Sequence, residues 1–203
     1  MADQELSARV PRRLRLARAV SELLSPPQLL LVLVLAVAWQ SSPNPGMAAV
    51  WGGTAALFAG VLPIALLVRG VRQGRLSDRH ISLREQRIRF GILVIASTLA
   101  GLAALASLDA PARMIAVLAS TAVGEVVGWV VTLWWKISAH AAIAAGAATV
   151  LLLVFGAPML AAWPVVALVA WSRIQVGDHT PAQVLAGVAL GVAVNAAVFP
   201  LLQ

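Results

Sequence analysis

The chain has 203 residues, of which 61% are hydrophobic and 11% charged, and its mean hydropathy is +0.90. This composition excludes an ordinary soluble domain and indicates an integral membrane protein, because several apolar runs approach the roughly 20 residues that cross a bilayer. Cysteine is absent, which excludes disulfides and thiolate metal sites. The formal net charge is +7, and the placement of the cations along the chain is more informative than its size.

The first segment, residues 1–22, is polar and basic. It contains five arginines, Arg9, Arg12, Arg13, Arg15 and Arg18. Two interpretations stay open: an amphipathic helix on an anionic membrane surface, or a solvated tail that fixes topology. No small-residue cleavage pattern follows, so we expect the segment to remain in the mature protein. The predicted division is therefore a basic interfacial segment over 1–22 and a transmembrane domain over 23–203.

Seven apolar segments follow, punctuated by proline and glycine, at roughly 26–41, 47–69, 90–108, 111–135, 138–155, 158–172 and 181–202. Spanning segments must satisfy their backbone groups internally, so all of them are predicted to be helices. The predicted fold class is an all-α, polytopic transmembrane bundle of about six to seven helices. Gly187 and Gly191, four residues apart, favour close packing between helices.

Three polar islands interrupt the apolar sequence, at residues 70–89, 136–140 and 172–180, and they hold all three histidines. An even number of predicted helices precedes each island, so all three are expected on the side of the membrane that holds the N-terminus. Of the 15 Lys and Arg residues, only Arg113 falls on the opposite side in this topology. By the positive-inside rule, the side with the islands is predicted to be cytoplasmic.

The second island contains Lys136, Ser138 and His140. Lys136 and His140 are four residues apart, so we expect them to share a helical face. Ser138 can cap the helix start and leave backbone N–H groups free for an anion. The alternative is an interfacial lysine, a simple cap and a histidine bonded to a carbonyl.

The third island ends one helix at Ser172-Arg173 and places His179 immediately before the next. Thr180 and Gln183 have capping-box spacing, with Pro181 at the first helical position. His179 therefore lies at the positive end of a helix dipole, which attracts phosphate and favours a neutral imidazole. Arg173 can hold two phosphate oxygens in a bidentate fork. The alternative is a polar loop with a positive-inside arginine.

The first island is rich in arginine between Arg75 and Arg89. This density suits a phosphate cage or a surface for anionic headgroups, and Asp78 and Glu85 are expected to orient arginines through ion pairs. The alternative is a loop anchored by positive-inside cations.

Over residues 75–200 this pattern resembles the type 2 phosphatidic acid phosphatase (PAP2) superfamily. The family signature reads Lys-x6-Arg-Pro, then Pro-Ser-Gly-His, then Ser-Arg-x5-His-x3-Asp. The third part is matched well by Ser172-Arg173-x5-His179, and the second in part by Ile137-Ser138-Ala139-His140. The first part is matched weakly, with His80 at the lysine position and Arg87-Ile88 in place of Arg-Pro.

The resemblance implies a role for each matching residue. His179 corresponds to the nucleophile that forms a phosphohistidine, and His140 to the general acid. Gln183 stands where the family has the acid that orients the nucleophile. The implied phosphate-binding residues are Arg173, Ser138 and Arg87, with Arg84, Lys136 and His80 as helpers. No metal or other cofactor is implied.

The implied function is a membrane-embedded phosphatase acting on a lipid or isoprenoid phosphate or diphosphate. The expected partners are that substrate and the bilayer, and no nucleic acid; the sequence leaves the oligomeric state open. Gln183 in place of an acid keeps an alternative open, a catalytically weak or inactive relative that binds or carries anionic lipids. Metal binding by the three histidines is a weaker option, because no pair has the spacing of helical ligands.

Glu125 lies inside the fourth apolar segment. An ionisable group at this depth is a candidate functional residue. The interpretation that we favour is structural: a protonated glutamate hydrogen-bonded across helices, with Asn195 or Thr132 as the expected partner.

Overall fold

The computed structural model describes residues 11–77 and 83–203, and within these ranges every regular element is a helix. The predicted all-α class is confirmed. The elements are α2 Arg12–Leu23, α3 Pro26–Ser41, α4 Pro45–Ala56, η1 Leu57–Val61, α5 Leu62–Arg72, α6 Arg84–Ser107, α7 Ala112–Thr132, α8 Ala139–Phe155, η2 Ala157–Ala162, α9 Trp163–Gln175 and α10 Pro181–Leu202.

All seven predicted apolar segments are helical. In the part of the chain that the structure describes, five continuous helices are long and apolar enough to cross a membrane, and α2 with α3 forms a sixth candidate span with a 43° bend. The fifth segment, α8, has 17 residues and is shorter. The second segment runs without a break through α4, η1 and α5. Its π-helical turn precedes Pro63, as expected where a proline that lacks an N–H interrupts the hydrogen-bond ladder.

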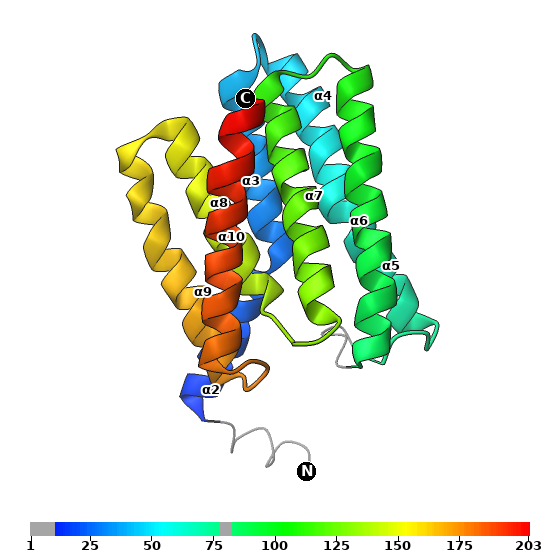
Figure 1. The fold of residues 1–203 in the computed structure, drawn as a ribbon, viewed down its shortest axis with the longest axis vertical. Helices are drawn as coiled ribbons and strands as arrows, with labels where there is room; N and C mark the ends of the chain where they lie inside the picture. The colour runs from blue at the N-terminus through cyan, green and yellow to red at the C-terminus, as the bar shows by residue number, and fades with distance from the viewer. Residues whose placement is uncertain (1–10, 78–82) are drawn as a thin grey trace.

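The polar connections gather at one end of the bundle, as the count of helices predicted. Figure 1 shows the end of α5, the start of α6 and the α7–α8 and α9–α10 connections at the lower end, together with α2. The α3–α4 and α6–α7 connections and the C-terminus lie at the upper end. Asp78, Arg79 and His80 lie outside the described residues.

Helices α8 and α10 pack with their backbones in direct contact. A Cβ atom on Gly187 would lie 2.5 Å from the Ser138 carbonyl oxygen, and one on Gly191 would lie 2.0 Å from that of Ala142. At the start of both helices the Ser138 N–H donates to the Gln183 carbonyl oxygen at 3.2 Å. The packing role predicted for the two glycines is confirmed, and it places the second polar island beside the third.

The basic N-terminal segment is partly helical. Helix α2 extends to Leu23, one residue beyond the predicted boundary, and packs along α9 with Ala17 and Ser21 buried. Its four arginines are exposed. The arginine-bearing face of α2 is therefore available to anionic groups, and contact with a membrane surface stays a prediction.

Glu125 has a cross-helix partner, but the predicted partners were wrong. The Thr98 hydroxyl on α6 donates to Glu125 Oε1 at 3.1 Å. Thr132 and Asn195 donate to carbonyl oxygens of their own helices, those of Gly128 and Gly191. The reason is geometric: Glu125 lies on the face of α7 that packs against α6, and apolar composition alone does not reveal which face meets which neighbour.

Candidate functional site

The second and third islands meet at Asp178, in the connection between α9 and α10. Lys136 Nζ donates to the Asp178 carbonyl oxygen at 2.6 Å, and the Arg173 guanidinium forms an ion pair with the Asp178 carboxylate at 2.5 Å. Arg173 is only 2% exposed, so its charge is satisfied by protein groups more than by water. Two cations from different islands therefore converge on the residue before His179.

His179 lies just before α10, half-buried. Burial, followed by the nearby charges of Lys136 and Arg173, lowers the pKa of His179 to about 4; Gln183 and Asp178 oppose this with smaller effects. The imidazole is therefore neutral at pH 7, with a ring nitrogen able to attack an electrophile. Among the described residues its Nδ1 atom is buried without a hydrogen-bond partner.

Gln183 completes the predicted capping box. Its backbone N–H donates to the Thr180 hydroxyl oxygen at 3.3 Å, and its side-chain oxygen accepts the Thr180 backbone N–H at 3.2 Å. The Gln183 side chain therefore takes part in the cap, and it also forms a hydrogen bond with His179 that acts to raise the pKa of the imidazole. The capping box also positions the first turn of α10 directly after His179, which favours an anion there.

Ser138 and His140 begin α8. Ser138 is the N-cap, fully buried, and its hydroxyl accepts the Ala141 N–H at 3.4 Å. His140 follows in the first helical turn. The expectation that Lys136 shares a helical face with His140 is wrong, because α8 starts at Ala139 and Lys136 lies in the preceding connection. An extended backbone there lets the lysine reach Asp178.

Two arginines of the first island begin α6. Arg84 and Arg87 are in the first turn of this helix, which packs on α7; the Trp129 indole N–H donates to the Ile88 carbonyl oxygen at 2.9 Å. In Figure 1, α7 stands between α6 and α10, and it packs against both helices. The expected pairing of Glu85 with an arginine is confirmed by its ion pair with Arg89.

One contact was missed by the sequence analysis: the Arg173 guanidinium donates to the hydroxyl of Ser21 on α2. A polar cavity of about 330 Å³ borders the same guanidinium, lined by Arg18, Ser21, Glu22, Arg173, Val176 and Asp178. The available signal was the four-residue spacing of Ala17 and Ser21, two small residues on one face of a basic helix. That spacing predicts a packed face but not its partner.

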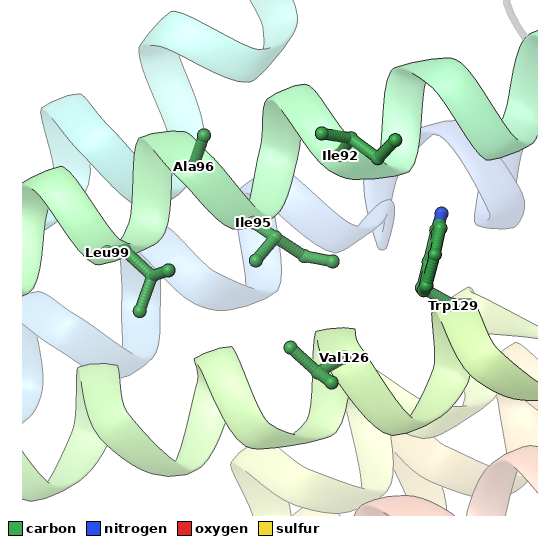
Figure 2. Close-up of a pocket in the computed structure, with 6 residues that line it drawn as sticks. All are labelled: Ile92, Ile95, Ala96, Leu99, Val126 and Trp129. Atoms are coloured by element: carbon green, nitrogen blue, oxygen red, sulfur yellow. The ribbon is translucent and has the colours of Figure 1, made fainter.

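A second hollow, of about 370 Å³, lies between α6 and α7. Figure 2 shows Ile95 and Leu99 of α6 facing Val126 and Trp129 of α7 across it, and Ile92 and Ala96 also line it. Every side chain that lines this hollow is apolar or aromatic, so it suits a hydrocarbon chain and offers nothing to a phosphate. Within residues 11–77 and 83–203, no group of three or more His, Asp or Glu side chains is placed to hold a metal ion.

The bundle and its polar end define a polytopic helical membrane protein with a candidate anion site between α8, α9 and α10. Residues 135–203 match the family model of the PAP2 superfamily. The match begins at the second island and runs to the last residue, so the predicted resemblance is confirmed over α8, α9 and α10. No curated protein and no solved structure matches the chain significantly. PAP2 proteins are typically phosphatases.

Proposed function

We propose that the protein is a membrane-embedded phosphatase that hydrolyses a lipid or isoprenoid phosphate or diphosphate through a phosphohistidine on His179. The observation that carries the proposal is a neutral imidazole at the start of α10, close to the cations Lys136 and Arg173. A neutral imidazole is a nucleophile, and the two cations with the helix N-terminus stabilise charge on the phosphoryl oxygens. The match of residues 135–203 to a phosphatase family supports the same reaction class.

In the proposed mechanism, a ring nitrogen of His179 attacks phosphorus in line with the leaving oxygen. A nitrogen–phosphorus bond forms, the bond to the lipid oxygen breaks, and His140 gives its proton to that oxygen. His140 then takes a proton from water, which attacks the phosphohistidine and releases phosphate. Ser138 and Arg173 bind the phosphoryl oxygens. Arg87 joins them as a phosphate binder, and Arg84, Lys136 and His80 are helpers that attract the anionic headgroup.

The test is phosphate release by the purified full chain in detergent, with chelator present. The substrates are phosphatidic acid, phosphatidylglycerol phosphate, and isoprenyl mono- and diphosphates. We expect release from at least one of them. Arg113→Ala serves as the matched control, because it removes a cation from the opposite end of the bundle; its rate should equal that of the wild type.

The second candidate is a protein that binds or carries anionic lipids without hydrolysing them. It is favoured by one observation: the side chain that forms a hydrogen bond with His179 is the neutral amide of Gln183, and the buried Nδ1 of His179 has no partner among the described residues. Saturable lipid binding by the wild type, without phosphate release from any lipid of the panel, would overturn the phosphatase and support the lipid-binding protein.

We further propose that the site faces the cytoplasm, because α2 and the polar connections, which carry most of the lysines and arginines, lie at its end of the bundle. The chain lacks cysteine, so single cysteines report topology without background. Ser77→Cys, at the end with the site, is expected to resist a membrane-impermeant thiol reagent in intact cells and to react after lysis. Ser107→Cys, at the opposite end of α6, is the control and should react in intact cells. The reverse labelling pattern would invert the proposed orientation.

A further inference from the structure

Helix α2 contacts the candidate site through one buried side chain. Ser21 is 5% exposed and lies against Arg173, although the two residues are 152 positions apart in the chain. The interaction joins the N-terminal helix to the strongest phosphate-binding candidate of the third island. A guanidinium buried to this degree needs several acceptors, because an unpaired buried charge is strongly destabilising.

The two described partners of the Arg173 guanidinium differ in charge. Nη2 is bound by the Asp178 carboxylate, an anion, and Nη1 donates to the neutral Ser21 hydroxyl. A phosphate can replace the carboxylate, since both are anions that accept from the same fork. The serine has no charge to exchange and stays bound while the opposite side of the guanidinium changes partner. Ser21 thereby holds Nη1 in place, and Nη2 is the donor that can exchange the carboxylate for a phosphate.

The polar cavity lies beside the contact between Ser21 and Arg173. It has a volume of about 330 Å³, and α2 contributes Arg18, Ser21 and Glu22 to its wall. At about 30 Å³ per water molecule, this space is large enough for a phosphate group with part of its hydration shell. Arg18 adds a cation to the wall and Glu22 adds a carboxylate, so α2 both attracts and repels an anion bound there.

We propose that α2 forms one wall of the phosphate site, with Ser21 as the positioning residue of Arg173 and Arg18 as a second cation facing the bound phosphate. The identity of the ligand as a phosphate rests on the proposed function. The contribution of α2 extends the site beyond residues 135–203, the part of the chain that matches the PAP2 model.

The test measures the Kd of inorganic phosphate for the full chain in detergent by isothermal titration calorimetry. Ser21→Ala removes a hydrogen bond to a charged group and is expected to raise the Kd roughly tenfold. Ser21→Thr keeps the hydroxyl and should restore the wild-type Kd, which a defect in folding alone would not allow. Ser25→Ala is the matched control, because Ser25 lies between α2 and α3 and does not line the cavity.

Two variants that each remove one charge from α2 should shift the Kd of phosphate in opposite directions. Arg18→Gln should raise the Kd and Glu22→Gln should lower it, each roughly fivefold for a charge about 4 Å from the ligand in a water-like medium. A purely structural role of α2 would not produce opposite shifts. An unchanged Kd in Ser21→Ala, or equal shifts in the two charge variants, overturns the proposal, and so does a wild type that shows no saturable phosphate binding.

The failure of this inference and the failure of the proposed function are distinguishable. Phosphate binding that depends on Ser21, in a protein that hydrolyses no lipid, supports the proposed role of α2 and overturns the proposed phosphatase function. Lipid hydrolysis with the same KM and the same phosphate Kd in Ser21→Ala as in the wild type supports the phosphatase function and overturns the role of α2.

Discussion

His179→Ala is expected to reduce phosphate release by at least about 10³-fold for every substrate that the wild type hydrolyses, since it removes the nucleophile of the proposed mechanism. The rates are measured in detergent under single-turnover and steady-state conditions. Thr180→Ser is the matched control: it alters the adjacent residue but keeps the hydroxyl that caps α10, and its rate should stay close to that of the wild type. Substantial activity in His179→Ala would mean that another group attacks phosphorus.

The same residue gives the reaction a defined pH dependence. The pKa of His179 is about 4, lowered from an ordinary value of 6.5 by burial and the nearby cations. Protonation removes the attacking electron pair, so kcat/KM should show no loss from His179 between about pH 7 and pH 5 and should fall below about pH 4. The unfolded chain binds this proton more readily. The contribution of His179 to stability is therefore full above about pH 6.5 and is lost as the pH falls toward 4.

Gly191→Ala is expected to destabilise the bundle by about 3 kcal/mol and to impair the site with it. The added Cβ would lie 2.0 Å from the Ala142 carbonyl oxygen and 2.9 Å from the Gly146 nitrogen. Both are backbone atoms, so no side chain can turn aside, and α8 must move away from α10. That movement strains the bond between the Ser138 N–H and the Gln183 carbonyl, which holds the starts of the two helices together.

The measurement is thermal unfolding in detergent, paired with phosphate binding at a temperature where the variant remains folded. Gly128→Ala is the matched control on α7, because its nearest neighbour would be Leu190 Cδ2 at 3.6 Å, an ordinary contact. A helix-interior glycine replaced without a clash should gain up to about 1 kcal/mol. Equal melting temperatures for Gly191→Ala and the wild type would contradict the close approach of α8 and α10.

The sequence predicted the features that depend on local signals. Proline and glycine at the joints marked all seven helical segments, and the even count of helices placed the three islands at one end. The Thr180–Gln183 capping box and the Gly187–Gly191 contact were also predictable, because each follows from spacing within one helix. The roles assigned to individual site residues remain predictions.

The arrangement of helices around the bundle was not predictable from these signals. The composition of an apolar segment does not identify the helices that it packs against, so the position of α7 between α6 and α10 could not be predicted. The pairing of Glu125 with Thr98 follows from that order. The contact of Ser21 with Arg173 joins opposite ends of the chain, and neither residue has a local pattern that identifies the other.

The short length of α8 determines how deep the reaction takes place. Its 17 residues span about 26 Å at 1.5 Å per residue, less than a hydrocarbon core of about 30 Å. A core of this thickness with Phe155 at its far boundary would place His140 a few ångströms below the near one. In the proposed reaction the lipid then stays in its leaflet and meets the enzyme by lateral diffusion. The rate should follow the mole fraction of lipid in the micelle, so adding detergent at constant bulk lipid concentration should slow hydrolysis.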